Sequence, residues 1–209
     1  IGTTKRGIGP CYADKYTRIG LRVGDLIDFE AFKRKLKSTL SIKNDQITKL
    51  YNEEPFDYDA MVAQFSMIRE KLMPRMMDSL SVVNEALDQD KMVLFEGAQA
   101  AMLDINYGTY PYVTSSSPTS AGVCAGAGVS PMKLDKIIGV VKAYSTRVGE
   151  GPFVSELLNE EGEKLRAIGH EYGATTGRPR RCGWLDLNVV KHAARINGLT
   201  DLVITKIDV

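Results

Sequence analysis

The segment 205–208 reads Thr-Lys-Ile-Asp and directly follows the apolar run 202–204. A strand followed by Lys-x-Asp is an arrangement with which GTP-binding proteins read guanine. The Asp208 carboxylate can accept hydrogen bonds from N1–H and from the exocyclic amine of guanine, a bidentate pair that adenine does not offer. The Lys206 stem can lie along the face of the base. The tetrapeptide alone is weak, because the sequence holds no GxxxxGK[ST] phosphate loop. Either the guanine interpretation is wrong or the phosphate loop lies in a preceding segment.

The segment 173–184 places two hydroxyls beside three arginines, Arg178, Arg180 and Arg181. A glycine and a proline within it disfavour a helix, so we expect a loop. The arginines repel one another unless anions lie among them. Guanidinium groups bind carboxylate or phosphate through two parallel hydrogen bonds. The loop therefore predicts a substrate with one of these groups, and the alternative is a solvated basic loop that binds nothing.

Two more polar runs follow apolar runs: 96–99 follows 92–95, and 142–148 follows 137–141. Ligands of open α/β sheets bind at the carboxyl ends of the strands, so both runs are candidate ligand contacts. Any α/β loop is polar, however, and one such run carries little weight. The glycines of 122–128 do not complete a dinucleotide-binding motif, since Pro131 stands where the last glycine belongs. We expect a small-residue helix packed against the sheet there.

Apolar periodicity predicts the helices that position these loops. Apolar residues recur at helical spacing from 32 to 40, after the possible cap Asp28, and from 61 to 72, after Asp57 or Asp59. Pro74 interrupts the second pattern, which resumes from 80 to 87. These patterns predict a helical subregion at about 26–89.

Beyond the helical subregion the apolar pattern changes. The runs 92–95, 137–141 and 202–204 are typical of buried strands, and helical patterns at 157–167 and 185–196 separate the later ones. Strands alternating with helices favour an α/β fold with a mainly parallel central sheet and flanking helices. At about 150 residues per domain, the chain of 209 residues predicts one large domain, or one domain with an appended helical piece.

Composition excludes several classes of protein. The net charge of +1 gives no reason to expect nucleic acid or an anionic membrane as a partner. The nearly uncharged stretch 98–131 is rich in Ser, Thr, Gly and Pro and contains Asp104, so it predicts no membrane span. The cysteines, three in number and far apart, indicate a reducing, cytoplasmic setting. With only two histidines and no Cys-x-x-Cys, we expect no metal site in this chain.

The first residue is Ile, within the glycine-rich stretch 1–10, and the last residues form an apolar run with polar residues at its end. We therefore expect the chain to be the interior of a longer protein.

Seven segments, taken in order along the chain, resemble the adenylosuccinate synthetase family. They are 1–10, 20–25, 96–99, 103–116, 142–148, 173–184 and 205–208. The resemblance implies a P-loop-like GTP-dependent ligase architecture that is incomplete here. Residues 1–209 would be the central part of a single domain, without the family's amino-terminal phosphate loop, its catalytic Asp and His, and its carboxyl-terminal part.

The activity that the resemblance implies is a step of AMP synthesis, in which IMP, L-aspartate and GTP give adenylosuccinate, GDP and phosphate. GTP would phosphorylate the 6-oxygen of IMP, and the aspartate amine would then displace phosphate. Mg2+ would take part, with its ligands outside this chain. The 209-residue piece alone is expected to be inactive, since the phosphate loop and the general base lie elsewhere.

The family's ligand contacts transfer to this sequence residue by residue. Gln99 would support catalysis by facing the reacting 6-position, and Arg18 would reach across a homodimer interface to the IMP of the other subunit. The residues that the resemblance assigns to IMP are Thr4, Arg18, Gln99, Thr114, Val148 and Arg178. Those assigned to aspartate are Ala174, Thr175, Thr176, Gly177, Arg178, Pro179 and Arg180. Those assigned to GTP are Arg180, Lys206, Ile207 and Asp208.

Two other interpretations of the sequence stay open at this point. The segment 205–208 would also suit a regulatory GTP-binding switch protein, although the arginine loop and the run 96–99 have no task in one. The chain could also be a non-catalytic structural portion of the ligase. An assay of adenylosuccinate formation by the full-length parent, with GTP and then with ATP, tests the ligase interpretation.

Overall fold

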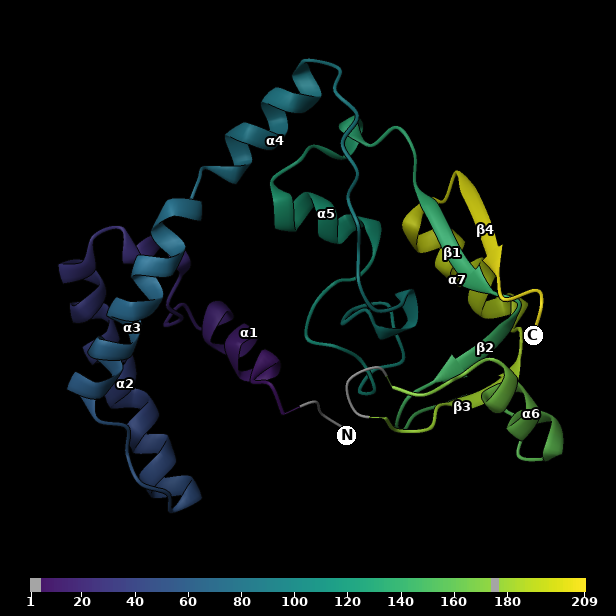
Figure 1. Cartoon of the computed structure of the whole chain (residues 1–209), viewed down its shortest axis with the longest axis horizontal. Helices are drawn as coiled ribbons and strands as arrows, with labels where there is room; N and C mark the ends of the chain where they lie inside the picture. Colours follow the sequence, from purple (N-terminus) through teal and green to yellow (C-terminus); the bar gives the residue numbers. More distant parts are fainter. Residues whose placement is uncertain (1–4, 174–176) are drawn as a thin grey trace. The chain divides into compact units, whose positions relative to one another are not determined.

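The chain divides into two units, of which the first comprises Gly7–Asp78 (Figure 1). The structure is a computed structural model and describes residues 5–173 and 177–209. The helices of the first unit are α1 (Ile8–Tyr16), α2 (Phe29–Tyr51) and α3 (Tyr58–Leu72), with short 3-10 turns η1 (Val23–Leu26) and η2 (Met73–Arg75).

Local capping sets the ends of these helices. The Asp28 side chain accepts a hydrogen bond from the Ala31 amide at 3.0 Å and caps α2. Asp57, and not Asp59, caps α3 by accepting from the Ala60 amide at 2.8 Å. Pro74 lies in η2, directly after α3. The predicted helices and the interruption at Pro74 are therefore confirmed. The sequence could predict them because capping and the effect of proline depend on neighbouring residues alone. The predictions did not include α1.

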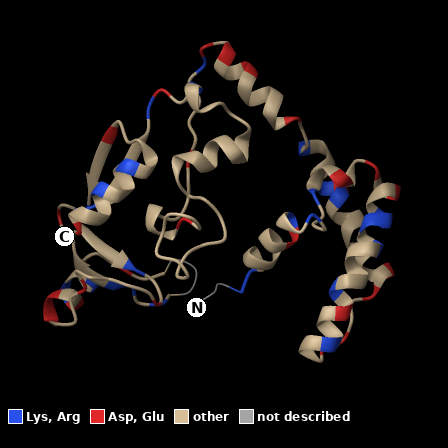
Figure 2. Cartoon of the chain, turned by 180° about the vertical axis from the view of Figure 1, so that it is seen from behind, with Lys and Arg blue, Asp and Glu red and all other residues tan. Residues whose placement is uncertain are grey.

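The apolar stripe of α2 forms the core of the first unit. Leu26, Phe32 and Leu36 are buried, and α3 packs its own apolar residues against them. The Phe32 ring stacks on Phe29 at 5.6 Å between centroids and meets the edge of Phe65 at 5.0 Å. Lys and Arg residues recur along the rest of α2 (Figure 2). The pattern is that of an amphipathic helix.

The second unit comprises Ser79–Val209 and the described residues 5–6. Its helices are α4 (Ser79–Asp88), α5 (Ser120–Ala127), α6 (Glu160–Ile168) and α7 (Leu187–Asn197), with 3-10 turns η3 (Ala101–Leu103) and η4 (Pro131–Lys133). Its strands are β1 (Ile138–Lys142), β2 (Tyr144–Arg147), β3 (Arg181–Trp184) and β4 (Asp201–Thr205). The helix expected at 122–128 is α5, and those expected at 157–167 and 185–196 are α6 and α7.

The strands form two pairs. Strands β1 and β4 lie parallel, with Ile138 opposite Asp201 and Lys142 opposite Thr205 (Figure 1). Strands β2 and β3 are antiparallel. The α/β class and the parallel pairing of two of the three predicted strands are thus confirmed. The antiparallel pair was not predicted, because its short polar sequences carry no apolar pattern.

The strand predicted at 92–95 is wrong. The segment has no regular structure, and Met92 is fully exposed. A strand needs a neighbouring strand for its backbone hydrogen bonds. None of the described strands pairs with segment 92–95, so its apolar sequence alone does not make it a strand. The predicted burial of the other strands is also wrong in this structure, since Val140 of β1 is 72% exposed. No helix within residues 5–173 and 177–209 has the length and apolar character needed to cross a membrane.

We predict that Phe32→Ala destabilises the helical unit by about 3–5 kcal/mol, since truncating a fully buried aromatic residue leaves a cavity. Urea unfolding followed by circular dichroism measures this change. The matched control is Phe56→Ala, whose side chain is 57% exposed. It should cost no more than about 0.5 kcal/mol. Equal losses in the two variants would contradict the assigned core.

Candidate functional site

A buried carboxylate, Glu171, occupies the centre of a polar cluster at the end of β1. Its Oε1 accepts from Lys142 Nζ at 2.8 Å and from the Tyr144 hydroxyl at 2.5 Å. Its Oε2 accepts from Arg180 Nη1 at 2.8 Å. Lys142 also donates to the Thr146 hydroxyl at 2.5 Å. One carboxylate therefore joins the β1–β2 connection to the arginine loop.

The turn after α6 brings Glu171 into this position. The helix is capped by Gly169, and His170 has a left-handed backbone with φ 53°. A Cβ atom on Gly169 would lie 2.2 Å from the Tyr144 hydroxyl oxygen. Residue 169 must therefore lack a side chain if Tyr144 is to reach Glu171.

Electrostatics in the cluster favour the charged carboxylate. Burial by itself raises the pKa of Glu171, but hydrogen bonds from Lys142 and Tyr144, the charge of Lys142 and the hydrogen bond from Arg180 outweigh it. The pKa therefore lies below the ordinary value of 4.5. Burial first, and then the hydrogen bond to Glu171 and its negative charge, raise the pKa of Tyr144, which remains a donor.

The cluster carries more positive than negative charge. Lys142 and Arg180 both form an ion pair with Glu171. Within the described residues, neither forms an ion pair with a second carboxylate. Among the described residues, the Nε of Arg180 is buried and has no hydrogen-bond partner. Buried donors without partners are rare in folded proteins. This arrangement suits an anionic ligand.

Glu171 and Arg180 form the base of the loop that the sequence singled out. The Arg180 amide donates to the Glu171 carbonyl at 2.9 Å, and the Gly173 amide donates to the Arg178 carbonyl at 2.8 Å. Between them, Pro179 forms an isolated antiparallel bridge with Tyr172. The Gly177 amide donates to the Gly173 carbonyl at 2.7 Å. Three further residues predicted to bind aspartate, Ala174, Thr175 and Thr176, lie outside the described residues.

The segment predicted to read guanine contacts the same turn. Lys206 Nζ donates to the Gly169 carbonyl at 2.9 Å, two residues before Glu171. At the base of this segment, the Ala143 amide donates to the Thr205 carbonyl at 2.8 Å, next to Lys142. Ile207 and Asp208 are exposed beyond the end of β4. Lys206 and Arg180, both predicted to bind GTP, thus contact the same short turn, residues 169–171.

A second arginine, Arg147, connects two segments predicted to bind IMP. Its Nη2 donates to the Thr109 hydroxyl at 2.9 Å and to the Tyr112 carbonyl at 3.2 Å. Burial, and then the nearby charge of Arg181, lower the pKa of Arg147. Thr114 lies two residues beyond Tyr112, and Val148, 53% exposed, follows Arg147 directly. The Thr114 amide donates to the Leu103 carbonyl at 2.9 Å, which ties its loop to η3.

Other predicted residues lie apart from these clusters or outside the description. Gln99 is exposed in an irregular segment with φ 65°, and its side chain makes no hydrogen bond within residues 5–173 and 177–209. Arg18 belongs to the helical unit, where it is exposed after α1 with φ 63°. Thr4 lies outside the described residues. The structure does not test these assignments.

Sequence reasoning missed Glu171 as well as the roles of Lys142, Tyr144 and Arg147. The polar run 142–148 drew attention because it follows a strand, but only Val148 was assigned a ligand. Glu171 gave a weaker signal, since one acidic residue between a helix and a glycine does not differ in sequence from a surface residue. Only its burial, at 2% exposure, distinguishes it.

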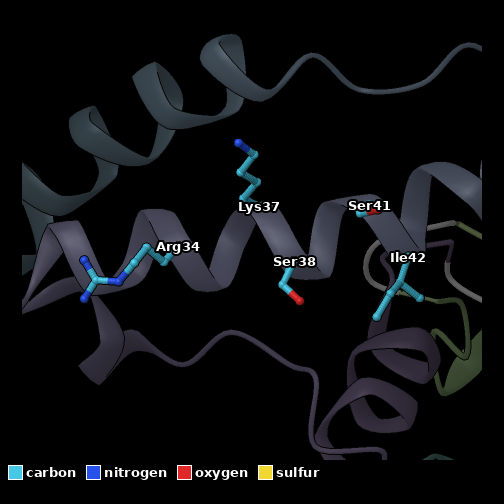
Figure 3. Close-up of a pocket in the computed structure, with 5 residues that line it drawn as sticks. All are labelled: Arg34, Lys37, Ser38, Ser41 and Ile42. Carbon is cyan, nitrogen blue, oxygen red and sulfur yellow. The ribbon is translucent and has the colours of Figure 1, made fainter.

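Two further features of the described residues contrast with the Glu171 cluster, the grouping of possible metal ligands and a surface hollow. Within the described residues, no three His, Cys, Asp or Glu side chains are grouped closely enough to hold a metal ion. No chemical step is assigned through a metal ion. A shallow hollow on α2 is lined by Arg34, Lys37, Ser38, Ser41 and Ile42 (Figure 3). Lys37 and Ser38 point to opposite sides of the helix, so the hollow lacks converging ligand groups (Figure 3).

Comparison with known proteins identifies relatives along the whole chain. The family model for adenylosuccinate synthetase matches residues 1–209. The adenylosuccinate synthetase of Fusobacterium nucleatum is 63% identical over 209 residues, which are 100% of this chain and 49% of the relative. That of Halothermothrix orenii is 57% identical over the same shares. The chain spans about half the length of the curated relatives it matches.

A solved structure agrees with the sequence comparison. The fully ligated adenylosuccinate synthetase of Plasmodium falciparum is 49% identical and superposes with a TM-score of 0.90, covering 99% of this chain and 48% of its own.

The depressed pKa of Glu171 predicts how stability depends on pH. Because the folded-state pKa lies below the ordinary 4.5, the stabilisation is fully present above that value and is lost as the pH falls through the folded-state pKa. Glu171→Gln should cost about 3 kcal/mol near pH 6, and the deficit relative to wild type should narrow toward about pH 3. Urea unfolding at several pH values measures the difference.

The control for this prediction is Glu54→Gln, a carboxylate-to-amide change at an exposed position. It should change the free energy of unfolding near pH 6 by no more than about 0.5 kcal/mol. A deficit of Glu171→Gln that stays constant from about pH 6 to about pH 3 would show that the ion cluster does not stabilise the fold through its charge.

Proposed function

The chain belongs to the adenylosuccinate synthetase family, and from this premise we propose that it forms the central part of a ligase that uses GTP to join L-aspartate to IMP. The products are adenylosuccinate, GDP and phosphate. The observation that carries the proposal is the cluster around Glu171, where the arginine loop and the Lys206 segment meet in a chain that matches the family throughout. We define the complete enzyme as this chain with the flanking segments of its relatives.

The chemistry of the residues agrees with this reaction. A carbonyl oxygen leaves poorly until it has become a phosphate ester, so GTP phosphorylates the 6-oxygen of IMP before the aspartate amine displaces phosphate. Charge builds up in both steps, and fixed cations stabilise it. Lys142 and Arg180, held on one carboxylate, are cations with little freedom to move. Gln99 supports catalysis by facing the 6-position.

Ligand contacts are assigned in three groups within this proposal. IMP is bound by Thr4, Arg18, Gln99, Thr114, Val148 and Arg178. Aspartate is bound by residues 174–180, with Thr176 and Arg180 directed toward its carboxylates. GTP is bound by Arg180, Lys206, Ile207 and Asp208. Mg2+ accompanies GTP, with ligands outside residues 1–209.

The proposed assembly is a cytoplasmic homodimer. Arg18 reaches the IMP of the partner subunit, so each active site needs both chains. A regulatory GTP-binding switch is not favoured, because such a protein has no use for an arginine loop anchored on a buried carboxylate beside Lys206.

The proposed base contact predicts a change of nucleotide preference. Asp208→Asn in the complete enzyme places an amide donor against the guanine edge, which should cost on the order of 2 kcal/mol or more in kcat/KM for GTP. Xanthosine triphosphate carries an oxygen at the 2-position and should be used relatively better by the variant. Steady-state kinetics with both nucleotides measure the ratio, and an unchanged preference for GTP removes Asp208 from the site.

The two arginine assignments predict different kinetic defects. Arg180→Leu removes a carboxylate clamp, so the KM for aspartate should rise by the equivalent of roughly 2 to 4 kcal/mol and far more than the KM for IMP. Arg18→Leu should raise the KM for IMP and leave that for aspartate nearly unchanged.

Subunit mixing extends this test to the dimer. Arg18→Leu and Gln99→Ala subunits, assayed at a low IMP concentration where each alone shows little activity, should regain activity when mixed, because one site of the hybrid then has both groups intact. Hybrids that form, as shown by size-exclusion chromatography, and yet stay inactive would contradict a shared site.

A further inference from the structure

Glu171 holds Arg180 at two points. The carboxylate binds the guanidinium through Oε2, and the Glu171 carbonyl accepts from the Arg180 amide at 2.9 Å. The Arg180 carbonyl accepts from Arg166 Nε at 2.8 Å, on α6. An arginine on a free loop loses much side-chain entropy when it binds a ligand. Arg180 is already ordered by these contacts, so less of that entropy remains to be lost.

The carboxylate itself is oriented by its other partners. Lys142 and Tyr144 both donate to Oε1, which leaves Oε2 facing Arg180. Lys142 also lies over the Tyr144 ring, with Nζ 5.1 Å from the centroid. Glu171 is 2% exposed, while the Arg180 side chain is 31% exposed. The arginine therefore reaches solvent, and thus a ligand, while the carboxylate stays beneath it.

We propose that Glu171 is a positioning residue for aspartate binding, acting through Arg180 and contacting no substrate itself. This inference rests on the proposed function, in which Arg180 binds a carboxylate of aspartate. Glu171 holds the guanidinium in the orientation that the ligand needs. Aspartate supplies the negative charge that the cluster of two cations and one carboxylate lacks.

Two physical effects of removing the charge of Glu171 oppose each other. The local potential becomes more positive, which by itself strengthens the attraction of aspartate. Arg180 also loses the partner that orients it, which weakens binding. We expect orientation to dominate, because a bidentate contact depends on geometry as well as on charge. The direction of the change in KM therefore decides between positioning and simple electrostatics.

The experiment is a double-mutant cycle in the complete enzyme, with Glu171→Gln, Arg180→Leu and both together. In Glu171→Gln the side chain keeps one acceptor oxygen and gains an NH2 group, so at least one of the donors Lys142, Tyr144 and Arg180 loses its acceptor. Glu171→Gln should raise the KM for aspartate at least about tenfold and the KM for IMP less than about threefold. In the Arg180→Leu background the same substitution should raise the KM for aspartate less than about twofold, because its effect passes through Arg180.

Glu156→Gln is the matched control. Glu156 accepts from Arg181 of β3, the residue after Arg180, at 2.7 Å and 2.5 Å, but Arg181 has no assigned ligand. The control loses an ion pair of the same kind and should lose stability. Its KM for aspartate should stay within about twofold of wild type, since it leaves Arg180 oriented. A purely structural role of Glu171 would give the two variants the same kinetic profile.

Each outcome decides the inference. A KM for aspartate that falls or stays unchanged in Glu171→Gln overturns it, as does an equal rise in the Arg180→Leu background, and the proposed function then stands. If Arg180→Leu itself does not raise that KM, the assignment of Arg180 fails and the inference fails with it. The inference is supported if the rises in the KM for aspartate of Glu171→Gln and Arg180→Leu are non-additive in the double variant and the KM of Glu156→Gln is unaffected.

Tyr144→Phe keeps the experiment decisive if Glu171→Gln does not fold. The change removes one donor to Oε1 and keeps every charge and nearly the whole volume. The KM for aspartate should rise about threefold while the KM for IMP stays near wild type, because Glu171 loses part of its orientation. Circular dichroism and thermal unfolding verify folding. An unchanged KM for aspartate in the folded Tyr144→Phe enzyme overturns the inference.

Discussion

The buried carboxylate of Glu171 is the constraint on which the arrangement of the second unit depends. A carboxylate removed from water must be paired and hydrogen-bonded, and here Lys142, Tyr144 and Arg180 meet that requirement. Satisfying it draws together the end of β1, the start of β2 and the base of the arginine loop. The turn at Gly169 also receives Lys206, so the end of β4 joins the same centre.

Polar contacts replace an apolar core around this centre. The buried residues of the second unit include Asp104, Thr119 and Glu171 beside Tyr144 and Cys182. Asp104 accepts from two backbone amides and from the Thr119 hydroxyl, which fixes the loop before Thr114. Such networks specify geometry more sharply than apolar packing does, because each donor must meet its acceptor. That property suits loops that hold ligands in fixed positions.

The helical unit is built on a different principle. Its centre is the apolar stripe of α2 with Phe32 between two other aromatic rings. Stability there follows from buried area and close packing. Of the residues assigned to ligands, this unit carries Arg18, so its proposed contribution to catalysis depends on dimer assembly and not on its core.

The sequence by itself determined the features that depend on near neighbours: the cap Asp28, the break at Pro74, two of the three predicted strands and the loop rich in arginine. It also carried the family resemblance through motifs at fixed spacing. Only the tertiary structure decided that the segment 92–95 pairs with no described strand and that Glu171, not one of the motif residues, anchors Arg180. The physical reason is that periodicity and capping act within a few residues. The burial of a charge and the choice of its partners depend on segments that lie far apart along the chain.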